Sequence, residues 1–212
     1  MSLLSEWIVS GTRVLDAGCG HGDEAEYWAS LGADVIGVDF SQAYVDAASH
    51  RAGRQARYIW ASTKESLPFA DDSFDVIYTK KGPSVYREAN RLTRRGGRVA
   101  GLHPDRVMAE LPELLPGLFP VASEAHSLEH TLQTRLRQSG LDQIEMRPLR
   151  HIEYLQMPED VIRYRCFGQS ENVRGTVHDA WIDEITNVFQ RCADVRGLRV
   201  TSDFWLITAV AD

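Results

Sequence analysis

Short apolar runs alternate with helix-like runs through the first half of the chain. The apolar runs lie at residues 13–15, 33–38, 58–60 and 73–78, residues 94–99 turn into a fifth strand, and helix-like runs lie at 23–31 and 87–92. Apolar runs of this length are typical of buried strands in a parallel sheet. Their alternation with helices predicts a doubly wound α/β sheet, with helices on both faces and ligands at the carboxyl ends of the strands.

The second half of the chain has a less regular pattern. We expect residues 101–104 to leave the sheet, a helix at 127–139, and strands at 143–155 and 201–210. Between these strands lies an insertion, residues 157–197, with a helix start at 158–160 and a second helix at 176–193. We interpret this insertion, together with residues 103–125, as a cap over a substrate pocket.

A glycine-rich turn follows the first strand. Residues 14–22 read Val-Leu-Asp-Ala-Gly-Cys-Gly-His-Gly, so Asp16 stands at the strand tip and glycines occupy positions 18, 20 and 22. Glycines let the backbone come close to a ligand because they have no Cβ, and the carboxylate adds a negative acceptor. Such a turn suits a ligand with a cation and hydroxyl groups better than a pyrophosphate.

A dinucleotide-binding turn is the alternative interpretation. That turn requires G-x-G-x-x-G, but Asp23 takes the place of the third glycine and would face a phosphate with like charge. Asp39 ends the second strand, 19 residues after Gly20, where an acid accepts hydrogen bonds from two ribose hydroxyls. The pattern therefore predicts a ligand that carries a ribose.

Four segments share the order and spacing of one known family. They are residues 14–22, Val38-Asp39-Phe40-Ser41, Leu67-Pro68-Phe69 with Asp72-Ser73-Phe74-Asp75, and residues 87–97. In these segments the chain resembles class I S-adenosylmethionine-dependent methyltransferases of the methyltransferase type 11 group. The resemblance implies a Rossmann-like, mostly parallel seven-stranded sheet with helices on both faces and an antiparallel last strand. It also implies one methyltransferase domain over residues 1–212, with a cofactor-binding half at 1–101, a substrate or cap half at 102–197 and a closing strand at 198–212.

The resemblance implies S-adenosyl-L-methionine as the cofactor and assigns its contacts residue by residue. Asp16 and the backbone of residues 17–20 meet the methionine end, Asp39 holds the ribose, and Phe40 lies on the adenine. The loop 63–65 takes the adenine edge, although a threonine stands at position 63, where relatives usually carry Asp or Asn. The expected cofactor-binding residues are Asp16, Ala17, Gly18, Cys19, Gly20, Asp39, Phe40, Thr63, Lys64, Glu65 and Tyr78.

Fewer residues of the sequence indicate where the substrate binds. Lys80, after the fourth strand, is expected to bind a carboxylate or phosphate of the substrate, and Tyr164 in the insertion to line the pocket. Methyl transfer from a sulfonium does not require a dedicated base, and His103, just past the fifth strand, is the candidate base or orienting residue. Residues 126–130 match the zinc-peptidase pattern H-x-x-E-H, but the surrounding fold pattern favours another function, and we expect no metal.

The composition of the chain limits the partners it is expected to bind and the cellular compartment in which it is expected to act. The net charge of −7 lacks the basic excess typical of proteins that grip nucleic acid, so a nucleic-acid partner is disfavoured. No apolar run approaches the ~18 residues of a membrane span. The first residues carry no basic leader, and we expect a cytoplasmic protein. The three cysteines are far apart and predict neither a disulfide nor a zinc site: Cys19, Cys166 and Cys192.

The sequence thus predicts a methyltransferase that acts on a small molecule, as a monomer or a homodimer. Two alternatives remain open, a non-catalytic protein that binds S-adenosylmethionine and an RNA methyltransferase. The sequence does not specify whether the acceptor atom is oxygen, nitrogen, sulfur or carbon.

Overall fold

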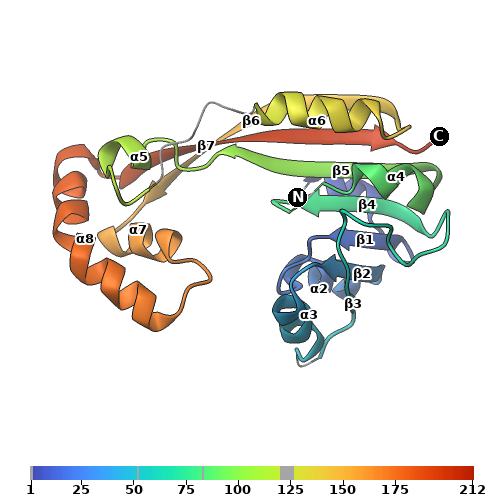
Figure 1. Cartoon of the computed structure of the whole chain (residues 1–212), viewed down its shortest axis with the longest axis horizontal. Helices are drawn as coiled ribbons and strands as arrows, with labels where there is room; N and C mark the ends of the chain where they lie inside the picture. The colour runs from blue at the N-terminus through green and yellow to red at the C-terminus, as the bar shows by residue number, and fades with distance from the viewer. Residues whose placement is uncertain (1, 52, 83, 120–126) are drawn as a thin grey trace. The chain divides into compact units, whose positions relative to one another are not determined.

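A computed structural model of the chain describes residues 2–51, 53–82, 84–119 and 127–212. Its strands form one seven-stranded sheet in the order β3-β2-β1-β4-β5-β7-β6 (Figure 1). The strands are β1 Arg13–Ala17, β2 Asp34–Asp39, β3 Arg57–Trp60, β4 Phe74–Lys80, β5 Thr93–Arg106, β6 Asp142–Leu155 and β7 Leu198–Val210. The helices are α1 Ser2–Trp7, α2 Asp23–Ser30, α3 Gln42–Ser49, α4 Tyr86–Leu92, α5 Leu111–Leu114, α6 Leu128–Arg137, α7 Pro158–Arg165 and α8 Glu171–Cys192.

The register of the sheet brings the strand ends of its parallel part to one edge. β1 pairs in parallel with β2 and β4, so Asp16 lies opposite Gly37 on one side and Tyr78 on the other. β3 pairs in parallel with β2, and β5 pairs in parallel with β4. β7 lies between β5 and β6 and is antiparallel. The predicted mostly parallel sheet with an antiparallel last strand is therefore confirmed.

Alternation along the strands produces cores on both faces of the sheet. Consecutive strand residues point to opposite faces, so Val14 packs in one cluster with Trp28 of α2, and Leu15 packs in another with Leu92 of α4. A third cluster joins Leu132 and its neighbours on α6 to β5 and β7. The helices thus cover both faces, as predicted.

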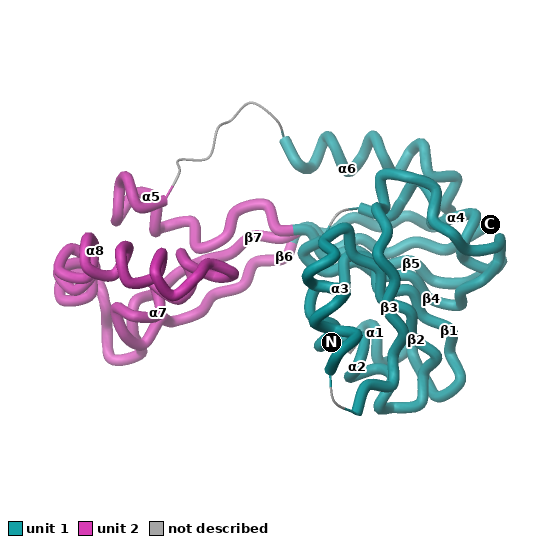
Figure 2. The backbone as a smooth tube through the Cα atoms, turned by 60° about the horizontal axis from the view of Figure 1, so that its bottom comes forward, with its two compact units in different colours: residues 1–103, 127–148, 205–212 teal, residues 104–126, 149–204 magenta. Residues whose placement is uncertain are grey.

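The chain divides into two compact units (Figure 2). Unit 1 comprises residues 1–103, 127–148 and 205–212, and unit 2 comprises residues 104–126 and 149–204. Unit 2 has its own apolar core, in which α5, α7, α8 and the strand ends contribute fully buried residues, among them Leu111, Leu115, Val161, Ile185, Val188 and Val200. The segment interpreted as a cap is therefore a folded unit with a core. No helix among the described residues is long and apolar enough to cross a membrane.

Two boundaries differ from the sequence prediction. Residues 101–104 do not leave the sheet, because Gly101 and Leu102 pair with Thr79 and Lys80 of β4 and the strand continues to Arg106. The last helix begins at Glu171, earlier than the predicted residue 176, and runs through Gly175. Packing of this helix in unit 2 outweighs the low helix propensity of a single glycine.

Candidate functional site

The turn after β1 is built on glycines in the left-handed region. Gly18, Gly20 and Gly22 have φ values of 88°, 54° and 81°, which side chains with a Cβ rarely adopt. The N–H groups of Gly18 and Cys19 donate to the carbonyl of Val38 at 2.8 and 3.0 Å and fix the turn to β2. A Cβ at Gly20 would meet nothing within 4 Å, so the backbone there is open to the approach of a ligand.

Asp39, at the end of β2, connects this turn to the next loop. Its Oδ2 accepts a hydrogen bond from the Gly20 N–H at 3.0 Å, and its Oδ1 accepts one from the Ser41 N–H at 2.9 Å. A carboxylate has about four acceptor positions, so both oxygens keep capacity for further donors. Asp39 is therefore a rigidly held acceptor with capacity for further hydrogen bonds.

A cavity of about 200 Å³ lies at the ends of β1, β2 and β3 and is called here the strand-end cavity. Its lining combines five of the residues expected as cofactor contacts with three outside that set: Gly18, Asp39, Phe40, Thr63 and Lys64, then Val38, Ala61 and Ser62. Phe40 is 66% exposed, and its ring offers a flat apolar surface. Ala61 and Ser62 directly follow β3, at the carboxyl strand ends where ligands bind in such sheets.

Asp16 lies buried beneath the glycine turn. Burial raises the pKa of its carboxyl to about 7, and the neighbouring charges of Glu24 and Asp39 add to the shift, whereas the Tyr78 hydroxyl and Lys80 oppose it. The pKa of the Cys19 thiol is shifted in the same direction, because burial and the nearby carboxylates raise it far above the usual value. The base of the turn therefore favours a positively charged ligand group.

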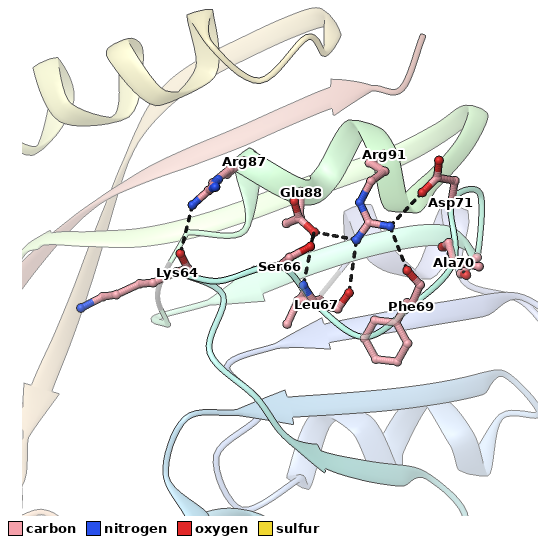
Figure 3. A network of polar contacts seen from close by, with 10 residues as sticks. Lys64, Ser66, Leu67, Phe69, Ala70, Asp71, Arg87, Glu88 and Arg91 are labelled. Atoms are coloured by element: carbon pink, nitrogen blue, oxygen red, sulfur yellow. Dashed lines mark hydrogen bonds and ion pairs between the residues drawn. The ribbon is translucent and has the colours of Figure 1, made fainter.

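The loop after β3 is anchored to α4 by a polar network (Figure 3). Glu88 accepts hydrogen bonds from the Ser66 hydroxyl at 3.1 Å and the Leu67 N–H at 3.3 Å, and it pairs with Arg91 at 2.6 Å. Arg91 also donates to the carbonyl of Phe69 at 2.8 Å. These contacts fix the loop that carries the predicted adenine-edge residues.

Within this loop the three predicted residues differ in their surroundings. Thr63 is buried, and its hydroxyl has no hydrogen-bond partner within the part of the chain that the structure describes. Lys64 is exposed, and its carbonyl accepts a hydrogen bond from Arg87 at 3.2 Å. Glu65 is also exposed and does not line the strand-end cavity.

Lys80 lies at the end of β4 and forms an ion pair with Glu24 of α2. Both line a smaller, mainly apolar cavity of about 110 Å³, together with Tyr78 and with Leu3 and Leu4 of α1. The two leucines were not predicted as site residues, because a six-residue helix with no motif gives no signal in the sequence. The positive charge of Lys80 is already paired with a carboxylate.

His103 is buried in β5, where its Nε2 lies 2.7 Å from the hydroxyl of Tyr86. Burial, together with the charge of Arg135, lowers the pKa of His103 to about 4, so the imidazole is neutral at pH 7. Neither of the two cavities described above has His103 in its lining. Tyr164 belongs to unit 2, where its half-buried ring stacks on Phe119 with 6.0 Å between ring centroids.

The H-x-x-E-H pattern lies only partly within the described residues. His126 lies outside them, and His130 is exposed on α6. Among the described residues, no group of three His, Cys, Asp or Glu side chains is arranged to hold a metal ion.

Comparison with known proteins identifies the segment that carries this geometry. Residues 15–101 match a protein family described as "Methyltransferase domain". Residues 15–101 form a class I methyltransferase domain. This confirms the methyltransferase family for this segment and the Rossmann-like fold expected from the sequence.

Named relatives of the methyltransferase domain extend the comparison. Methyltransferase GfsG of Streptomyces halstedii is 32% identical over 66% of this chain and 56% of its own length. The 27-O-demethylrifamycin SV methyltransferase of Amycolatopsis mediterranei is 27% identical over 77% of this chain and 75% of its own length. The chain thus spans little more than half the length of GfsG. The crystal structure of YcgJ from Bacillus subtilis shares the fold with a TM-score of 0.62 at 20% identity, covering 100% of this chain and 97% of YcgJ.

Proposed function

We propose that this chain is an enzyme that binds S-adenosylmethionine in the strand-end cavity and beneath the adjoining glycine turn, and methylates a small molecule. The observation that carries the proposal is the buried carboxyl of Asp16. Its pKa of about 7 results from burial that the nearby Lys80 does not offset. A ligand with an ammonium and a sulfonium group supplies the missing positive charge, whereas the pyrophosphate of a dinucleotide would add negative charge.

The residues around the cavity fit the remaining parts of the cofactor. The free acceptor capacity of Asp39 suits two ribose hydroxyls, and the exposed ring of Phe40 suits the face of adenine. The unpartnered hydroxyl of Thr63 suits the adenine edge, where it would gain a hydrogen bond. Gly18, Gly20 and the residues between them provide backbone that a bound methionine group can approach.

The protein's part in the reaction is to hold the cofactor and align the acceptor with its methyl group, rather than to activate the methyl group. When bound, S-adenosylmethionine supplies a methyl group already activated by its sulfonium. The buried turn and the anchored loop keep the cofactor site rigid, which favours an in-line arrangement of the acceptor. His103, neutral at pH 7, is able to accept a proton from an acceptor group and stays our candidate for that role.

A small-molecule acceptor is supported by two observations. The relative from Amycolatopsis mediterranei is named for the methylation of 27-O-demethylrifamycin SV. The net charge of −7 also disfavours a nucleic-acid acceptor. We propose Lys80 as an acceptor-side residue, with the Glu24 ion pair as the contact that an anionic acceptor would replace.

Titration calorimetry with three ligands tests the proposal. S-adenosylmethionine and S-adenosylhomocysteine should bind with micromolar dissociation constants (~−8 kcal/mol), while NADH should not bind. Absence of binding by both sulfur-containing ligands would overturn the proposal. Binding with no methyl transfer to any tested small molecule would instead favour a non-catalytic S-adenosylmethionine-binding protein. Transfer to RNA alone would favour an RNA methyltransferase.

A further inference from the structure

A third cavity adjoins the proposed cofactor site and is lined by polar side chains. This basic cavity has a volume of about 310 Å³ and is lined by Thr63, Lys64, Ser84, Arg87, Arg135 and Gln138. The residues come from the loop after β3, from α4 and the segment before it, and from α6 and the residue after it. Thr63 and Lys64 also line the strand-end cavity, so the two cavities share a wall. A molecule bound in one is therefore adjacent to a molecule bound in the other.

The charges of the basic cavity are unbalanced. Among the described residues, its lining contains three cationic side chains and no carboxylate. Within the described part of the chain, none of these three cations forms an ion pair, although arginines close by do so. Arg91, one turn from Arg87 on α4, pairs with both Glu88 and Asp71. In a chain with a net charge of −7, three cations without acidic partners form a local anion-binding surface.

The two guanidinium groups are held in place while most of their donors stay free. Arg135 donates from Nη1 to the Ser84 hydroxyl at 3.0 Å, and Arg87 donates from Nη1 to the carbonyl of Lys64 at 3.2 Å. Figure 3 shows Arg87 extended from α4 toward that carbonyl. A guanidinium has five N–H donors in a planar fork, so each arginine keeps several for a ligand.

A buried hydroxyl indicates a ligand at the wall that the two cavities share. Thr63 is 6% exposed, and its Oγ1 has no hydrogen-bond partner among the described residues although the residue lines both cavities. Buried hydroxyl groups without a partner are uncommon in native proteins and call for an explanation. A ligand in either cavity would provide the missing partner.

We propose that the basic cavity binds a phosphoryl group carried by the methyl acceptor. A tetrahedral dianion matches three cations from three segments better than a carboxylate, which has one charge and two oxygens. S-adenosylmethionine has no phosphate, so the anion belongs to the second ligand. A cavity of about 310 Å³ also suits one phosphoryl group rather than the extended backbone of a nucleic acid. The assignment of the anion to the acceptor rests on the proposed function, whereas the anion site itself does not.

The test is the binding of inorganic phosphate to the full chain, measured by calorimetry and by ³¹P NMR line broadening. Arg135→Gln and Arg87→Gln should each weaken phosphate binding about tenfold or more, because each removes a charged hydrogen-bond donor. Arg137→Gln is the matched control, since Arg137 is exposed in the same last turn of α6 and does not line the cavity. Thermal unfolding of each variant checks that it folds. Succinate, a dicarboxylate of equal charge, should bind more weakly than phosphate.

Each outcome separates the anion site from the proposed function. Three results would overturn the phosphoryl site: no binding of phosphate, equal binding to all variants, or binding no tighter than that of succinate. S-adenosylmethionine, titrated in parallel, would still show whether the chain binds the cofactor. Phosphate bound through Arg87 and Arg135 in a chain that does not bind S-adenosylmethionine would confirm the site and overturn its assignment to a methyl acceptor.

Discussion

Asp16 and Asp39 stand 23 positions apart in the sequence at the ends of neighbouring strands, yet their carboxyl groups behave differently. Both are buried, but Asp39 accepts two backbone hydrogen bonds, whereas the pKa of Asp16 is raised to about 7. The sequence predicted both as cofactor contacts because each ends a strand. It could not predict the pKa of Asp16, since that value depends first on burial and then on Tyr78, Glu24 and Lys80, which only the fold brings together.

Replacing Asp39 by alanine should weaken the binding of S-adenosylmethionine by ~2–3 kcal/mol, the scale for lost hydrogen bonds to a charged group. The variant also loses the acceptor that holds the Gly20 and Ser41 N–H groups. Calorimetry measures the effect. Asp34→Ala is the control, because Asp34 begins the same strand and pairs with Arg57 at the surface. Equal affinity in the Asp39 and Asp34 variants would contradict the ribose assignment.

The binding of S-adenosylmethionine should depend on pH through Asp16. Folded Asp16 keeps its proton up to about pH 7, whereas an unfolded aspartate has a pKa near 3.8. The folded chain therefore holds more protons between these values, and the free energy of unfolding without ligand should fall as pH rises through this window. A cationic ligand favours ionised Asp16, so affinity should rise up to about tenfold per pH unit toward pH 7 and then level off.

Calorimetry across this pH range, in buffers that report proton release, measures the dependence. Asp16→Asn should bind the cofactor more weakly and without this pH profile, because asparagine does not ionise. A wild-type affinity that is constant from about pH 5 to about pH 8 would show that Asp16 does not meet a cation.

At the scale of elements, the site is assembled from loops that follow strands. The first two of these loops were predictable, because glycine spacing and a terminal acid mark them in the sequence. The loop after β3 has no such motif, and only its position after a strand end marks Ala61 and Ser62. Arg135 of the basic cavity lies more than seventy positions from Lys64. The last helix also begins earlier than predicted, because packing in unit 2 carries it through Gly175. Contacts between distant segments depend on topology and packing, which local patterns do not encode.

The turn itself can be tested with a pair of glycines. Gly20 and Gly11 both have positive φ, and a Cβ at either would meet nothing within 4 Å. Alanine at each position should lower the free energy of unfolding by about 1–2 kcal/mol through backbone strain. Only Gly20→Ala should also weaken the binding of S-adenosylmethionine, by ~1–3 kcal/mol, because its methyl group occupies the space of the ligand. Thermal unfolding and calorimetry measure the two effects, and equal affinities would place the cofactor elsewhere.

At the scale of the whole molecule, each of the two compact units has its own apolar core. The strands and most of the helices of unit 1 were predicted because strands and helices alternate there, although α1 and α3 were not. Unit 2 was predicted only as an insertion with two helices, since its core draws on α5, α7 and α8 and on strand ends far apart in the sequence. A separate core means that stability can be changed in one unit without altering the site in the other.

Ile185→Ala tests this independence. The side chain is fully buried in the core of unit 2, so its truncation should destabilise that unit by ~2–5 kcal/mol. Hydrogen exchange should accelerate in unit 2 and stay unchanged at the glycine turn, with unaltered affinity for S-adenosylmethionine. Val195→Ala, at a fully exposed position of the same unit, is the control. Faster exchange throughout unit 1 would show that the two cores unfold together.

The surroundings of the Cys19 thiol bear on whether the protein methylates itself. It lies in the turn proposed to hold the methionine end of a methylating agent, and sulfur is readily methylated when it is a thiolate. Burial and the carboxylates of Asp16 and Asp39 keep this sulfur protonated at neutral pH. The same negative surroundings that attract the cofactor thus protect the enzyme from methylating itself, and alkylating reagents should modify the exposed Cys192 before they modify Cys19.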